Sequence, residues 1–98
     1  MVVLRAEVFR RLSFDVIVSS TGIALSYILS RHRGLTAYVK NRDIIEYLNV
    51  SGYKSIDFTL INNAVRENKV IVDLRNRLWI YDGYIKTTKR IKHVFRRC

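Results

Sequence analysis

Apolar residues recur at helical spacing in the first third of the chain, and the pattern is clearest after residue 20. One stripe of an amphipathic helix is formed there by four apolar residues and one histidine: Ala24, Leu25, Ile28, Leu29 and His32. Gly34 is a favourable end for this helix, because glycine accepts the left-handed conformation that follows a last helical turn. The pattern therefore predicts a helix from about Ser20 to Gly34.

The residues before this helix are ambiguous. Val8 and Leu12 fall close to helical spacing, and Ser13 is a suitable cap for a following helix. Residues 14–18 are rich in β-branched side chains, which fit a strand equally well. Both alternatives stay open for residues 1–19.

A short strand or extended connector is predicted over residues 35–39, followed by a helix. Asn41 is a suitable N-cap for that helix, and Asp43 lies in its first turn, where the helix dipole favours negative charge. Its apolar face is compact and comprises Ile44, Ile45, Tyr47 and Leu48. We expect this helix to run for about eight to ten residues.

Another helix is predicted after a tight turn. Ser51 and Gly52 give the turn signal, and either Ser55 or Asp57 caps the helix that follows. This helix is expected to end near Asn68. Its buried stripe is expected to comprise Leu60, Ile61, Ala64 and Val65.

Two strands are predicted next, over residues 70–74 and 78–81. Both are rich in residues that fit a pleated, half-buried surface. Residues 75–77, Arg-Asn-Arg, join them at a length typical of a hairpin. Gly83 is expected to end the second strand.

The chain has 98 residues, of which 49% are hydrophobic, and this length supports one domain with one core. The aromatic and aliphatic content excludes a disordered basic tail, and the length excludes a barrel enzyme or a dinucleotide fold with a substrate domain. Cys98 is the single cysteine, which excludes an internal disulfide framework and a cysteine-built zinc site.

The charge of the chain points to a polyanionic partner. Eighteen Lys and Arg against eight Asp and Glu give a net charge of +10. The net charge is +3 over residues 1–33, +1 over 34–84 and +6 over 85–98. The apolar spacing at residues 91–95 predicts a short, strongly basic helix, so residues 85–98 are expected to form a basic C-terminal segment beside a core of about 20–84.

No membrane span or signal peptide is expected. The most apolar stretch, residues 14–29, is short for a span and contains several polar residues. The start of the chain lacks the long apolar region of a signal peptide. We therefore expect a soluble protein in the cytoplasm with no membrane partner.

The predicted order of helix, short strand, helix, tight turn, helix and two-stranded hairpin resembles the winged-helix variant of the helix-turn-helix family. The resemblance covers residues 20–84, and small archaeal and archaeal-virus regulators look most similar in size and composition. It implies an α+β fold in a single domain: a three-helix core, a β-hairpin wing, and extra N- and C-terminal segments. In this family the helix after the turn lies in the major groove of DNA, and the wing contacts the backbone or minor groove.

The resemblance makes helix 55–68 the recognition helix and residues 75–77 the wing. Asn pairs with adenine through two hydrogen bonds, Arg contacts guanine or phosphate, and Ser or Thr contacts either. The basic C-terminal segment is expected to add phosphate contacts that carry no sequence information. The expected nucleic-acid-binding residues are Lys54, Ser55, Thr59, Asn62, Asn63, Arg66, Arg75, Arg77, Lys86, Lys89 and Arg90.

The leading hypothesis is a DNA-binding transcriptional regulator that acts as a homodimer on double-stranded DNA. The nearly neutral charge of residues 34–84 favours an alternative, a winged-helix accessory subunit of an archaeal replication, transcription or ribosomal complex. RNA binding is a third possibility. The C-terminal segment is alternatively a solubilising tail or a dimer-forming helix, in which case Cys98 could link two subunits.

Neither catalysis nor a cofactor is expected. His32 and His93 have no carboxylate or cysteine at metal-ligand spacing, which favours structural or surface positions for both. The acidic residues are scattered over predicted helices and strands, and no Ser/His/Asp arrangement or glycine-rich phosphate loop is present. The sequence therefore predicts a binding protein without enzymatic activity, metal or cofactor.

Overall fold

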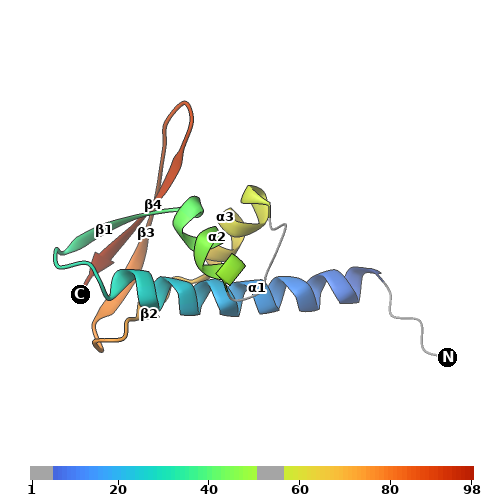
Figure 1. Ribbon diagram of the computed structural model, residues 1–98, viewed down its shortest axis with the longest axis horizontal. Coiled ribbons are helices and arrows are strands. Elements are labelled where there is room, and N and C mark those ends of the chain that lie inside the picture. The colour runs from blue at the N-terminus through green and yellow to red at the C-terminus, as the bar shows by residue number, and fades with distance from the viewer. Residues whose placement is uncertain (1–5, 51–56) are drawn as a thin grey trace.

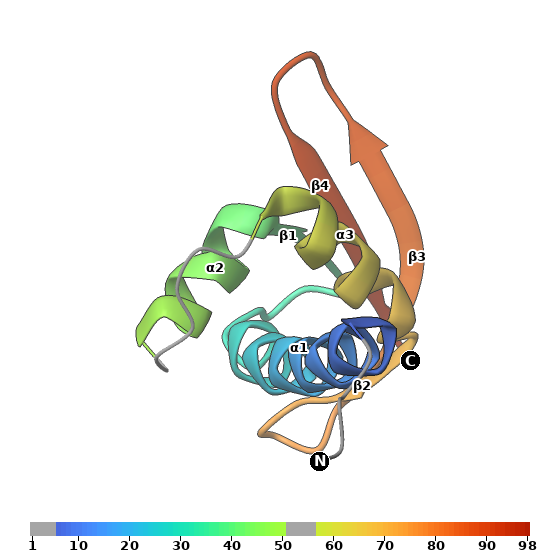
Figure 2. The same ribbon diagram turned by 90° about the vertical axis from the view of Figure 1, so that its right-hand side faces the viewer.

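Three helices and four antiparallel strands make up the described part of the chain, and the helices pack on one face of the sheet (Figures 1 and 2). The structure is a computed structural model that describes residues 6–50 and 57–98, with side chains from residue 14 onward. Its elements are α1 (Ala6–Leu29), β1 (Thr36–Lys40), α2 (Asn41–Val50), α3 (Phe58–Glu67), β2 (Val70–Val72), β3 (Leu78–Lys86) and β4 (Ile91–Arg97). The strands lie in the order β1-β4-β3-β2, so the fold is α+β, as predicted.

α1 starts well before residue 20, and the strand alternative for residues 14–18 is wrong. These residues lie inside one continuous helix, where Ile17 is buried in the same cluster as Ala24 and Leu25. The β-branched composition of this segment is overridden because a helix places Ile17 against the core. The prediction that this helix ends at Gly34 is also wrong, since α1 ends at Leu29.

The end of α1 is set by a side chain from a distant part of the chain. The Arg77 guanidinium donates hydrogen bonds to the carbonyl oxygens of Leu29 and Ser30, at 3.1 and 3.2 Å. The last carbonyls of a helix lack partners within the helix, and the helix dipole favours a cation there. Gly34 instead lies in the connection to β1.

α2 and α3 begin close to the predicted positions. Asn41 is the first residue of α2, and Asp43 lies in its first turn. Asp57 caps α3, because its side chain accepts a hydrogen bond from the Leu60 backbone N–H at 2.9 Å. The predicted stripe of α3 is confirmed: Ile61, Ala64 and Val65 are buried, and Leu60 is partly buried.

The hairpin turn predicted at residues 75–77 is confirmed, within a connection that spans residues 73–77. Asn76 at its centre has a φ of 62°, the left-handed conformation that asparagine tolerates better than most residues. The turn is therefore encoded by the local sequence.

A buried carboxylate holds this turn. Asp73 accepts hydrogen bonds from the Arg75 N–H (2.8 Å), the Arg77 N–H and Nε (3.0 and 2.8 Å) and the Trp79 Nε1–H (2.8 Å). Burial alone raises the pKa of Asp73, but these hydrogen bonds outweigh it, Trp79 first, and lower the pKa to about 2. Asp73 therefore stays ionised and fixes both the turn and Arg77.

The prediction that Gly83 ends the second strand is wrong, because β3 continues through it to Lys86. The register with β4 shifts between Tyr81 and Tyr84, which marks a β-bulge. Gly83 has a φ of +86°, a conformation that glycine adopts at little steric cost. The glycine thus bends the strand instead of ending it.

The predicted C-terminal helix is wrong, because residues 91–97 form β4, which pairs with β1 on one side and β3 on the other. His93 and Phe95 are fully buried. Val94 between them points to the opposite face, as expected for neighbouring residues of a strand. The apolar spacing also fits a helix, but the two adjacent strands decide the outcome. Residues 85–98 are therefore part of the fold and not a separate tail.

The core lies between the helices and the sheet. Trp79 and Phe95 are its largest side chains and form one cluster with Leu25, Leu29 and Ile61 from the helices. No described helix covers the other face of the sheet (Figure 2).

We expect Asp73→Ala to lower the free energy of unfolding by about 3 kcal/mol, because it leaves several buried donors without an acceptor. Urea denaturation at neutral pH measures this change. Asp82→Ala is the matched control: Asp82 pairs with Arg96 on the surface, so its loss is expected to cost less than about 1 kcal/mol. Equal losses in the two variants contradict the structural role of Asp73.

Candidate functional site

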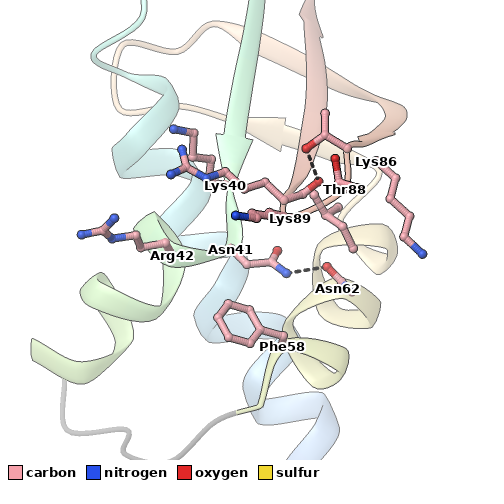
Figure 3. A pocket seen from close by; sticks show the side chains of 11 residues that line it. Lys40, Asn41, Arg42, Phe58, Asn62, Lys86, Thr88 and Lys89 are labelled. Atoms are coloured by element: carbon pink, nitrogen blue, oxygen red, sulfur yellow. Dashed lines mark hydrogen bonds between the residues drawn. The ribbon is translucent and has the colours of Figure 1, made fainter.

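A cleft of about 440 Å³ lies between α3, the start of α2 and the turn that joins β3 to β4 (Figure 3). Its lining residues are Lys40, Asn41, Arg42, Phe58, Asn62, Lys86, Thr87, Thr88, Lys89, Arg90 and Ile91. This volume is within the range of sites that bind small molecules or parts of larger ligands.

Positive charge dominates the cleft. Five of its lining residues are Lys or Arg, and none is Asp or Glu. Arg42 is the one cation of the five that forms an ion pair with another described residue. Its partner is Glu46, at 3.8 Å, and both side chains are highly exposed. Such an exposed pair is weak, and the N-terminus of α2 at Asn41 adds its partial positive charge. The cleft therefore attracts anionic groups.

Three of the cations, Lys86, Lys89 and Arg90, lie on or beside the β3–β4 turn. Thr87 closes this turn, because its N–H and hydroxyl donate to the Arg90 carbonyl oxygen at 2.9 and 3.2 Å. Figure 1 shows the hairpin projecting from the body of the molecule. The expectation that these residues belong to a basic tail is corrected, since strands on both sides of the turn hold them in place.

The outward face of α3 contributes polar side chains. Thr59, Asn63 and Arg66 are exposed, as the helical geometry predicted. Asn62 is half-buried and lines the cleft next to Phe58, which is 63% exposed at the start of the helix (Figure 3). The helix thus brings one amide and one aromatic ring to the cleft.

The two arginines of the predicted wing do not reach the cleft. Arg75 and Arg77 lie on the turn at the opposite end of β3 (Figure 1). Arg75 is exposed, whereas the Arg77 guanidinium is bound to Asp73 and to the end of α1. Lys54 and Ser55, also expected to bind nucleic acid, lie outside the described residues.

A chain of hydrogen bonds connects the sheet to the cleft. The Tyr81 hydroxyl lies 3.1 Å from His93 Nδ1, and His93 Nε2 lies 2.8 Å from Asn41 Oδ1. Asn41 Nδ2 donates to Asn62 Oδ1 at 2.5 Å (Figure 3). His93 and Asn41 are buried, so the chain passes through the interior. We call these four residues the polar relay.

The histidine of the relay is neutral. Burial lowers the pKa of His93 to about 4, and the positive charge of Arg66 contributes to the decrease. Burial raises the pKa of Tyr81, an effect partly offset by the positive charge of Arg66. The Arg66 guanidinium also lies over the Tyr84 ring, 4.6 Å from its centroid. Because the pKa of His93 lies well below 7, its imidazole carries a single proton at neutral pH, on one of its two nitrogens.

Sequence reasoning missed the relay and the cations at the β1–α2 junction. Asn41 was expected only as a helix cap, and its contact with His93 could not be foreseen while β4 was predicted as a helix. The prediction that His93 is structural agrees with its burial. One signal was available for the hairpin: the run Lys-Thr-Thr-Lys-Arg at 86–90 is polar and lies between two segments with β-branched and aromatic residues.

Within residues 6–50 and 57–98, no group of three or more His, Cys, Asp or Glu could hold a metal ion. In the same residues no helix has both the length and the apolar character needed to cross a membrane. Comparisons with known protein families, with curated proteins and with solved structures found no match for this chain. The cleft and its surroundings are therefore the basis for inferring function.

We expect the free energy of unfolding to fall as the pH decreases from about 6.5 to about 4. His93 takes up a proton near pH 6.5 in an unfolded chain but near pH 4 in the folded protein. Between these values the unfolded state binds the additional proton, so acid favours unfolding, and the contribution is complete above pH 6.5. Urea denaturation from pH 7.5 to 4.5 measures the effect.

In His93→Gln this part of the pH dependence is expected to disappear, even though the variant is less stable at every pH. His32→Gln, at a position outside the relay, is expected to keep the wild-type dependence. A His93→Gln protein with the wild-type pH dependence contradicts the assignment.

Proposed function

We propose that this protein binds double-stranded DNA as a transcriptional regulator of the winged-helix type, in the cytoplasm of an archaeal cell or of the host of an archaeal virus. The observation that carries the proposal is the cleft, where α3 and the projecting turn present cationic and polar groups and no acidic ones. In the proposed complex α3 enters the major groove, and the β3–β4 turn follows the phosphate backbone.

The order of the elements supports this proposal with a different wing from the one predicted. α1, β1, α2 and α3 follow one another as the winged-helix resemblance requires, and β2 then lies between α3 and the β3–β4 hairpin. The hairpin that projects is β3–β4, whereas the turn at residues 75–77 is held against the end of α1. We therefore assign the wing to residues 86–90.

The dimensions and chemistry of the site also suit DNA. A helix with its side chains has a diameter of about 10–12 Å, and the major groove is about 12 Å wide. Asn62, Asn63 and Thr59 on α3 offer hydrogen bonds to base edges. The cations of the wing neutralise phosphates and release counterions, which supplies affinity without sequence information.

We expect Lys89→Ala and Arg90→Ala each to weaken binding to duplex DNA of any sequence. Each is expected to reduce the slope of log K against log salt by about 1, because one phosphate contact is lost. Fluorescence anisotropy with labelled duplexes over a salt series measures both quantities.

Arg75→Ala is the matched control, because it removes an exposed arginine from the turn at the other end of β3. This variant is expected to bind as the wild type does. If Arg75→Ala weakens binding and Arg90→Ala does not, the wing belongs at residues 75–77. If neither the wild type nor any variant binds duplex DNA, the proposed function is wrong.

We also infer that two copies of the protein associate through the face of the sheet that the helices leave uncovered. Exposed apolar side chains on this face comprise Tyr38, Val70, Val72, Leu78 and Ile80. Cross-strand pairing places Val70 beside Ile80 and Val72 beside Leu78, so they form a continuous patch.

The charged residues Arg96 and Asp82 on this face do not oppose contact with a second copy of the protein, because they neutralise each other. Arg96, opposite Ile80 on the neighbouring strand, is paired with Asp82, so the patch can be covered without leaving that cation unpaired. A two-fold dimer would present two copies of α3 to DNA, which matches recognition of two half-sites.

We expect Ile80→Lys to weaken self-association at least tenfold, because a charge replaces the centre of the apolar patch. Sedimentation equilibrium at micromolar concentrations measures it. Ile23→Lys, which changes an exposed isoleucine on α1, is expected to leave self-association unchanged. A monomeric wild type overturns the dimer. A different protein that copurifies with the wild type but not with Ile80→Lys favours the accessory-subunit alternative instead.

A further inference from the structure

The orientation of the Asn62 amide in the cleft is set by the polar relay. Asn62 Oδ1 accepts a hydrogen bond from Asn41 Nδ2 at 2.5 Å, and Asn41 is 5% exposed. Among the described residues, none accepts a hydrogen bond from Asn62 Nδ2. The amide oxygen of Asn62 therefore faces Asn41 (Figure 3), and the NH2 group of this cleft-lining residue is left for a ligand.

The relay has a direction that follows from the chemistry of its members. Asn41 Oδ1 can only accept, so His93 Nε2, 2.8 Å away, carries the single imidazole proton. His93 Nδ1 is then an acceptor and receives the hydrogen of the Tyr81 hydroxyl.

Arg66 favours the same direction at the far end of the relay. The positive charge of Arg66 acts on the Tyr81 hydroxyl, and a cation favours the lone pairs of the hydroxyl oxygen on its own side. The Tyr81 hydrogen is left to point toward His93. Each bond of the relay thus runs from Tyr81 toward Asn62.

We propose that Tyr81, His93 and Asn41 are positioning residues that hold Asn62 as a donor in the cleft, so that the site selects guanine over adenine in the DNA major groove. Guanine presents two acceptors there, O6 and N7, whereas adenine presents one donor and one acceptor. The NH2 group of Asn62 matches the guanine edge, and the usual bidentate pairing of asparagine with adenine is disfavoured because Oδ1 is occupied. This inference rests on the proposed function.

A phosphate oxygen is the other acceptor that DNA offers to Asn62. The position of Asn62 favours the base, since it lies on α3, while the cations that suit phosphates lie on the β3–β4 turn and at the β1–α2 junction. A contact with phosphate would lower the affinity for all sequences alike when Asn62 is changed.

The decisive variant is Asn41→Asp. A carboxylate oxygen then replaces the amide donor beside Asn62, while the other oxygen still accepts from His93. Asn62 is expected to turn its amide, donate to the new carboxylate and present Oδ1 to the cleft. The preference for guanine should then be lost in favour of bases that present a donor, adenine or cytosine.

The experiment compares selection from random duplex pools by the wild type, Asn41→Asp and Arg42→Gln. Arg42→Gln changes the net charge by the same amount at the next residue but does not alter the relay. The wild type should prefer guanine over adenine at one position by about tenfold or more. Arg42→Gln should weaken binding and keep that preference, whereas Asn41→Asp should lose it.

Nitrogen-15 NMR of the free protein tests the relay without DNA. His93 is expected as the Nε2–H tautomer, and an Nδ1–H tautomer overturns the inference. So does an Asn41→Asp protein that retains the guanine preference. A wild type that binds DNA with no preference for guanine overturns this inference but leaves the proposed function intact, whereas absence of DNA binding removes both.

Discussion

The pairing of β4 on both of its sides is the constraint on which the rest of the structure depends. β4 lies between β1 and β3, so it joins the strand before α2 to the strand after α3. The same pairing buries His93 and Phe95 under the helices and makes the β3–β4 turn project from the body. The core, the relay and the cationic turn are therefore all consequences of one strand.

Two buried polar groups in this protein are stabilised in opposite charge states. Asp73 is kept ionised, because four hydrogen bonds satisfy its carboxylate and lower its pKa to about 2. His93 is kept neutral, because burial and the nearby Arg66 lower its pKa to about 4. The first group fixes a turn and the end of α1, whereas the second passes a defined hydrogen-bond direction to the cleft. The turn at residues 73–77 and the cleft thus depend on separate networks of hydrogen bonds.

The elements that could be predicted from the sequence are those whose signals are local. The cap at Asp57 and the buried stripe of α3 follow from neighbouring residues, as does the turn centred on Asn76. The secondary structure of residues 91–97 could not be predicted, because their apolar spacing fits both a helix and a strand. Pairing with β1 and β3, which are distant in the sequence or depend on the complete sheet, decides between the two. The outward face of α3 followed from helical geometry, but the contact of Asn41 with His93 joins residues far apart in the sequence and requires the complete sheet.

The topology of the sheet has a consequence for how the chain folds. β1 pairs with β4 between residues 36–40 and 92–96, so most of the chain forms the loop that this pairing closes. Closing a long loop costs conformational entropy before any contact compensates for it, whereas helices and short hairpins form from neighbouring residues. We therefore expect the pairing of β1 with β4 to be the slow step of folding, and the apolar stripes of the helices to be incompletely covered until it forms.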